Sequence, residues 1–270
     1  MGVINLSRDS FFRGSVTDPS EVVNRAARMV SDGAGMIDLG AMATGPSSKP
    51  VAPEAEKRAL IPAVRAVVRA LDAPVSVDTQ RAEVAAEAVS AGASVVNDVT
   101  GLKGDPEMAE VLRATGASAI LMASRRAPGD VYGMKEIREC LKKSLEICRA
   151  HGISMRRIVI DPGIGHWPGR LARIGHLRPR PGGYTPATDH DLRILARLRE
   201  LEALRRPICV GISRKSFIGE VLGGRKPEER LAGSLAATVI AILNGARLIR
   251  THDVRETADA ARIAEAIIGA

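Results

Sequence analysis

Short apolar runs of the sequence repeatedly end in a polar residue that could take part in chemistry. Carboxylates and carboxamides lie at the ends of five of these runs, an arginine ends the last run, and a histidine follows two residues later. These residues are Asn5, Asp38, Asp78, Asn97, Asp98, Asp161, Arg250 and His252. Of these, Asp78, Asn97 and Asp161, together with Lys215, could hydrogen-bond a planar heterocycle, because carboxylates accept its N–H groups and a lysine donates to its carbonyl oxygen. A lone Asp or Asn could instead cap the following helix, but several at one place favour a binding site.

This chemistry requires elements that bring the polar residues together. Runs rich in aliphatic and β-branched residues predict eight strands, at 1–5, 36–40, 75–78, 94–98, 119–122, 158–161, 208–211 and 248–250. Amphipathic segments that follow these runs predict eight helices, at 20–31, 53–71, 81–91, 106–115, 134–151, 189–204, 228–243 and 255–268. Strands and helices are therefore expected to alternate strictly along the chain.

Such alternation is typical of an α/β fold with a parallel sheet. A doubly wound open sheet would show the same order, but no glycine-rich dinucleotide motif follows the first run. The length of 270 residues suits one (β/α)8 barrel, so we predict a single TIM-barrel domain over residues 1–270. In such a barrel the carboxyl ends of the strands meet at one mouth. The three longest predicted loops, at 6–18, 41–52 and 164–188, follow strands at that mouth.

Composition restricts the classes of partner. The net charge of +8 and the pI near 9.9 would suit nucleic acid, a membrane surface or an anionic small substrate. Arginines are scattered through the predicted helices rather than gathered in an aromatic-laced stripe, which disfavours nucleic acid. No signal-like segment or membrane-spanning apolar stretch is evident, so we expect a cytoplasmic protein. The three cysteines lack metal-ligand spacing, and Cys209 is expected to be a buried structural thiol.

Several motifs at the predicted strand ends resemble those of one enzyme family. They are MGVINLSRDSFFRGS at 1–15, VSVDTQRAEVAAEAVSAGASVVNDVTGL at 75–102, DPGIG at 161–165, GISRKSFIG at 211–219 and RTHDV at 250–254. In this order they resemble the dihydropteroate synthase family of pterin-binding enzymes. The resemblance extends over nearly the whole chain and implies a pterin-binding TIM barrel.

The resemblance also implies a reaction and a set of residues. The family joins 6-hydroxymethyl-7,8-dihydropterin diphosphate to an arylamine, normally 4-aminobenzoate, and releases pyrophosphate. By position, Asn5 should help to hold Mg²⁺, Ser216 should face the carboxylate of the arylamine, and Thr44 should contact substrate. The expected lining of the pterin slot is Asp78, Asn97, Met122, Asp161 and Lys215. Arg250 and His252 should bind the diphosphate and, with Lys215, act in catalysis.

No triad is expected, because a diphosphate leaves readily once its charge is neutralised and an arylamine is nucleophilic without deprotonation. Family members are usually homodimers, so the resemblance implies a homodimer as well.

Four segments depart from the family pattern. In the loop after the first predicted strand, Ser7-Arg8 stands where the family usually has Thr-Pro. In GAMATGPSS at 40–48, Thr44 and Pro46 match, but Met42 replaces an acid and Gly45 replaces an arginine. Ala123 stands where the family usually has histidine. After DPGIG, the usual Phe-Gly-Lys is replaced by His-Trp-Pro at 166–168, followed by a basic insertion. Its arginines are Arg170, Arg173, Arg178 and Arg180.

The basic insertion leaves two interpretations open. It could be an exposed, partly disordered loop. Alternatively, with Arg8 it could accept a larger anionic arylamine, such as the phosphorylated ribosyl-aminobenzene derivatives of archaeal pterin cofactors, because guanidinium groups bind phosphate bidentately.

Two other functions compete with the synthase. One is a pterin-dependent methyltransferase that passes a methyl group to a cobalamin protein, and the other is a pterin-binding protein that has lost catalysis. SRKS at 213–216 together with RTHDV favours diphosphate chemistry over the methyltransferase.

Overall fold

Parallel strands, paired in chain order, form the centre of the protein. The computed structural model describes residues 1–6, 19–41, 51–179 and 183–270. Within these ranges one sheet holds eight strands. They are β1 (Gly2–Asn5), β2 (Ile37–Gly40), β3 (Val75–Asp78), β4 (Val95–Asp98), β5 (Ser118–Met122), β6 (Ile158–Asp161), β7 (Ile208–Gly211) and β8 (Ala246–Arg250). Each pairs in parallel with the next.

The last strand returns to the first. Gly2 bridges to Thr251, and the amide of Val3 donates to the carbonyl oxygen of Thr251 at 3.0 Å. This closure and the consecutive strand order define a (β/α)8 TIM barrel and exclude the open doubly wound sheet. The predicted fold class is confirmed.

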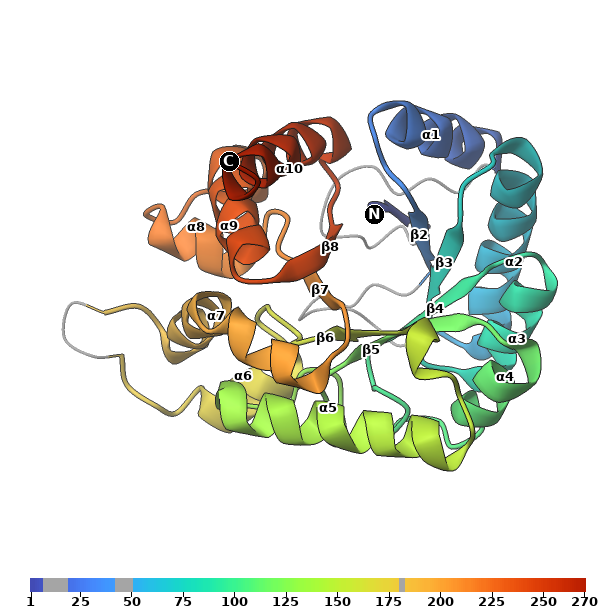
Figure 1. Cartoon of the computed structure of the whole chain (residues 1–270), viewed down its shortest axis with the longest axis horizontal. Coiled ribbons are helices and arrows are strands. Elements are labelled where there is room, and N and C mark those ends of the chain that lie inside the picture. Colours follow the sequence, from blue (N-terminus) through green and yellow to red (C-terminus); the bar gives the residue numbers. More distant parts are fainter. Residues whose placement is uncertain (7–18, 42–50, 180–182) are drawn as a thin grey trace.

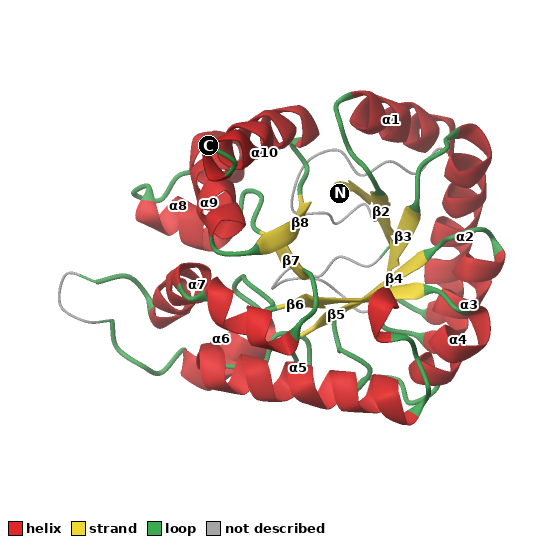
Figure 2. Cartoon of the chain, viewed as in Figure 1, coloured by secondary structure: helices red, strands yellow, loops and turns green. Residues whose placement is uncertain are grey.

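Helices enclose the strands (Figure 1), so that the sheet lies inside a ring of helices in Figure 2. The α-helices in the described ranges are α1 (Pro19–Ser31), α2 (Pro53–Ala70), α3 (Ala82–Ser90), α4 (Met108–Thr115), α5 (Gly133–Ala150), α6 (Pro168–Ile174), α7 (Pro186–Ala196), α8 (Ser216–Val221), α9 (Leu231–Leu243) and α10 (Val254–Ile268). Short 3₁₀ helices are η1 (Met155–Arg157), η2 (Leu198–Leu204) and η3 (Pro227–Glu229).

The prediction of strict alternation is wrong in two places. Helix α6 lies within the segment predicted as a loop at 164–188, and α8 follows β7 before the expected helix begins. Pro168 explains the start of α6, because its fixed φ and missing N–H suit the first helical turn. The predicted helix at 189–204 starts earlier, where the Thr185 side chain accepts from the Thr188 amide, and continues as η2 after Ala196.

The strands bury aliphatic side chains, as expected for parallel strands covered by helices. Ile4, Leu39 and Val77 are fully buried, which shows how a chain with 2% aromatic residues fills its barrel. Cys209 is buried, as predicted. In the described part of the chain, no helix combines the length and apolarity that crossing a membrane would need.

Candidate active site

Strand register places several of the predicted site residues in one row at the carboxyl end of the barrel. Asn5 on β1 lies beside Gly40 on β2, Gly40 beside Asp78 on β3, and Asp78 beside Asn97 on β4. Gly40 allows this close packing, because a Cβ there would lie 3.3 Å from the Cβ of Asp78. On the other side of the barrel, Met122 pairs with Asp161 and Gly211 with Arg250.

Arg250 joins β8 to this row. Its Nε donates to Asp38 Oδ2 at 2.7 Å, and its Nη2 donates to Asp78 Oδ2 at 2.9 Å. Burial alone would lower the pKa of Arg250, but the two carboxylates outweigh burial and raise it. Burial raises the pKa of Asp78, with Asp38 adding to the shift and Arg250 opposing it. Among the described residues, Arg250 Nη1 makes no hydrogen bond.

Asp161 begins the turn that follows β6. Its Oδ1 accepts from the amide of Gly163 at 2.6 Å, and burial raises the pKa of this carboxyl group. Gly163 has a φ of +74°, and a Cβ there would lie 3.1 Å from Met122 Cγ. Glycine is therefore required for both conformation and space. Met122 itself is buried and packs with Val99 and Trp167.

Lys215 and Ser216 follow β7 at the start of α8. The Nζ of Lys215 lies over the ring of Trp167, 5.4 Å from the ring centroid. Lys215 is half-buried, and burial lowers the pKa of its ammonium group, with Arg250 adding to the shift. No described residue makes a hydrogen bond or ion pair with Nζ. Ser216 is half-buried at the first position of α8.

His252 follows β8 and is packed against the loop after β7. Its Nδ1 lies 3.3 Å from Ser213 Oγ, and its backbone amide donates to the same oxygen at 3.4 Å. Burial and the positive charge of Arg250 lower the pKa of His252 to about 4. His252 is therefore neutral near pH 7 and can act as a hydrogen-bonding group rather than as a cation.

The first two arginines of the basic insertion have partners within the protein. Arg170 is fully buried, and its guanidinium donates to the carbonyl oxygens of Gly163 (2.9 Å), Gly165 (2.6 Å) and Val131 (2.9 Å) and to Asp191 Oδ1 (3.2 Å).

Arg173, on the same helix, pairs with Glu136 through both of its terminal nitrogens. The hypothesis that the insertion binds a phosphorylated arylamine is therefore wrong for Arg170, because this guanidinium is buried among internal acceptors. Arg178 is exposed, whereas Arg180, Thr44 and Arg8 lie outside the described residues.

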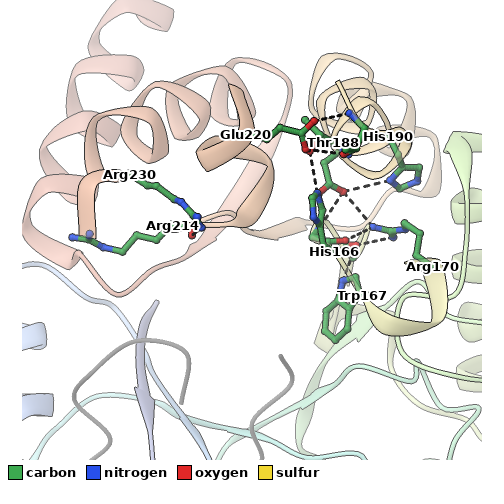
Figure 3. A network of polar contacts seen from close by, with 12 residues as sticks. His166, Trp167, Arg170, Thr188, His190, Arg214, Glu220 and Arg230 are labelled. Atoms are coloured by element: carbon green, nitrogen blue, oxygen red, sulfur yellow. Dashed lines mark hydrogen bonds and ion pairs between the residues drawn. The ribbon is translucent and has the colours of Figure 1, made fainter. Parts of the chain in front are cut away.

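A polar network behind the turn after β6 was not predicted (Figure 3). Within it, His166 Nε2 lies 3.1 Å from Thr188 Oγ1, and Thr188 donates to Glu220 Oε2 at 2.6 Å. His190, to which the sequence assigned no role, is buried and stacks on Tyr132 with ring centroids 5.1 Å apart. The density of His, Thr and Asp at 188–191 was the only indication in the sequence.

The site offers few metal ligands from the protein. Within the described ranges there is no group of three or more His, Cys, Asp or Glu residues that could hold a metal ion. Asn5 is half-buried at the end of β1 and provides one carboxamide. Any Mg²⁺ at this place would need most of its ligands from a substrate, as Mg²⁺ in phosphate-transferring sites usually does.

Comparisons with known proteins agree with this geometry. Residues 1–252 match the family of pterin binding enzymes. A dihydropteroate synthase from Synechocystis sp. is 34% identical over 99% of this chain and 89% of its own length.

Two solved structures have the same fold. A dihydropteroate synthase from Xanthomonas albilineans, solved with 4-aminobenzoic acid, has a TM-score of 0.86 at 33% identity and covers 100% of this chain and 93% of its own. One from Coxiella burnetii, in complex with pteroic acid, has a TM-score of 0.84 at 33% identity, with 99% and 92% covered. The chain belongs to the dihydropteroate synthase family of pterin-binding enzymes.

Proposed function

We propose that this protein condenses 6-hydroxymethyl-7,8-dihydropterin diphosphate with 4-aminobenzoate and releases pyrophosphate in folate synthesis. The observation that carries the proposal is the set of polar side chains gathered at the carboxyl ends of the strands, within a chain that resembles dihydropteroate synthases over its whole length. The relatives solved with pteroic acid and with 4-aminobenzoic acid support the same choice of substrates.

The pterin is bound by groups of matching polarity. Asp78 and Asp161 accept from the N–H groups of the heterocycle, and Asn97 can both donate and accept. Lys215 donates to the carbonyl oxygen, and Met122 packs against the ring. Because these groups come from separate strands of a rigid barrel, they hold the heterocycle in one orientation and thereby fix the direction of its reactive methylene.

The reaction breaks the bond between that methylene carbon and the diphosphate oxygen and forms a bond to the amine nitrogen, which then loses a proton. Arg250 is held by Asp38 and Asp78 with Nη1 still available, so it can receive the diphosphate without rearrangement. His252 adds a neutral hydrogen bond. Ser216, at the start of α8, faces the carboxylate of the arylamine. Thr44, which lies outside the described residues, is also proposed to contact substrate.

Mg²⁺ fits this arrangement when most of its ligands are diphosphate oxygens and Asn5 supplies one more. The ion would neutralise the charge that develops on the leaving group. Chelation with EDTA is expected to abolish pyrophosphate release and to leave binding of a diphosphate-free pterin unchanged.

We also propose a homodimer that acts in the cytoplasm. Helices α9 and α10 pack together and carry exposed isoleucines, among them Ile240, Ile263 and Ile267. Exposed apolar surface of this kind is typical of protein interfaces. Light scattering after size-exclusion chromatography should give twice the mass of the chain, and Ile263→Lys with Ile267→Lys should give the monomer.

A pyrophosphate-release assay tests the proposed reaction. Release that requires both the pterin diphosphate and 4-aminobenzoate is expected. A protein that binds the pterin but releases no pyrophosphate with any arylamine would be a binder without catalysis. Because Arg170 is buried and cannot reach a phosphate group, plain 4-aminobenzoate is favoured over a phosphorylated acceptor. An assay that includes both acceptors should show this preference.

A further inference from the structure

Lys215 has an unusual neighbour for a half-buried lysine. Its ammonium lies 5.4 Å from the centroid of the Trp167 ring and has no carboxylate partner among the described residues. An ammonium over an indole face at this distance is stabilised by the ring quadrupole. Burial opposes the charge and lowers the pKa of Lys215, so the ring compensates for part of the lost hydration.

The indole is held firmly in place. Its Nε1 donates to the carbonyl oxygen of Gly163 at 3.0 Å. The backbone of Gly129 lies against the ring, because a Cβ there would come within 2.1 Å of Trp167 Cγ. Arg170 fixes the same Gly163 carbonyl with its Nη2 at 2.9 Å. Trp167 therefore offers Lys215 a ring whose position is set by the turn after β6.

Trp167 also contacts the proposed pterin slot directly. It packs with Met122 and Val99, and its ring points away from the polar network of His166 and His190 (Figure 3). The indole thus touches one residue assigned to the heterocycle, Met122, and lies beneath the charge of another, Lys215.

A ring has one advantage over a carboxylate as the partner of this lysine. A carboxylate would engage the N–H donors of the ammonium, whereas a ring face stabilises the charge and leaves the donors available. In the described part of the chain, no ion pair joins Lys215 and Asp161, whose carboxylate accepts from the Gly163 amide instead. Both groups then remain ready to bind the heterocycle.

We propose that Trp167 is a positioning residue that holds the ammonium of Lys215 over its ring and directs the N–H donors toward the carbonyl oxygen of the bound pterin. This inference rests on the proposed function, because it assumes that the ligand is a pterin. It assigns a role to a residue that lies outside the motifs shared with the family.

Fluorescence tests the contact itself. Trp167 is the only tryptophan of the chain, so its emission reports on this place alone. Lys215→Met should change the emission, because it removes a positive charge from above the ring. Lys103→Met is the matched control, since Lys103 is another half-buried lysine but binds Ser144 Oγ and a carbonyl oxygen. Emission unchanged by Lys215→Met would overturn the contact.

Binding tests the positioning role, with 6-hydroxymethylpterin as the calorimetric probe. Trp167→Leu removes the ring and should weaken binding about three- to tenfold. Trp167→Phe keeps a smaller ring face and should recover most of that loss, which a purely space-filling role would not require. It also remains informative if the leucine variant fails to fold. In turnover, both variants should raise the KM for the pterin diphosphate while leaving the KM for 4-aminobenzoate unchanged.

Tyr132→Leu is the control for loss of an aromatic residue nearby. Tyr132 stacks on His190 rather than on Lys215, so its variant should bind the probe within about twofold of the wild type. Equal binding by the wild type and the two Trp167 variants would overturn the inference and leave the proposed function intact. Equal losses in the leucine and phenylalanine variants, or in Tyr132→Leu, would also overturn it. Failure of the wild type to bind the pterin would instead refute the proposed function.

Discussion

Replacing Arg170 with methionine should destabilise the protein far more than the same replacement at Arg173 on the same helix. Arg170 is fully buried and pairs with the buried Asp191. Removing one partner of a buried pair typically costs about 3–5 kcal/mol, because the other charge remains uncompensated. At roughly 2–4 °C for each kcal/mol in a chain of about this size, the Tm should fall by about 6–20 °C.

Arg173 provides the matched control. Its side chain is 43% exposed and pairs with Glu136 near the surface, where an ion pair contributes at most about 1 kcal/mol. Arg173→Met should therefore lower the Tm by less than about 4 °C. Scanning calorimetry at a fixed scan rate measures both. Adding Asp191→Asn to Arg170→Met should recover part of the loss, because it removes the unpaired carboxylate. Equal shifts for the two arginines, or a double variant less stable than Arg170→Met, would refute this reasoning.

The remaining predictions concern the row of residues at the strand ends. Gly40→Ala should weaken binding of 6-hydroxymethylpterin several-fold in calorimetry with little change in Tm, because the new Cβ pushes Asp78 out of position. Asp78→Asn should weaken the same binding by about ten- to a hundredfold, since it removes a charged acceptor; unchanged affinity would place the pterin elsewhere. His252→Gln should reduce the loss of stability that occurs as the pH is lowered. The folded pKa of His252, about 4, lies below its unfolded value, so the unfolded chain binds more protons between the two, and stability falls as the pH falls through this window. Urea midpoints at pH 7 and pH 5 should therefore differ less in this variant than in the wild type.

The sequence predicted the fold best where a polar Asp or Asn came at the end of a short apolar run. Short apolar runs with Asp78, Asn97 and Asp161 at or next to their last position predicted both the strands and the end of the barrel at which these residues lie. Helix α6 was missed because its segment is rich in proline, glycine and arginine, which predict a loop as readily as a short helix. Local pattern carries little information about such a helix, since its stability comes from tertiary contacts.

Ion pairs between residues far apart in the chain could not be predicted from the sequence, for a different reason. Arg170 pairs with Asp191, which lies 21 residues later in the chain, so this contact depends on the tertiary fold. Arg170 and Arg173 lie three residues apart on one helix, yet the first is fully buried and the second is exposed. The resemblance to a family could not resolve this, because the insertion is the part of the chain that departs from the family pattern.

The ion pairs of Arg250 have a consequence for how the protein is made. Asp38 and Asp78 lie 212 and 172 residues before the arginine that balances them. A nascent chain on the ribosome exposes both carboxylates long before β8 has been synthesised, and burying them without a counter-ion is costly. Closure of the barrel and completion of the ligand-binding end are therefore one late event in folding. A chain that stalls before β8 is made lacks Arg250, the positive charge that allows Asp38 and Asp78 to be buried.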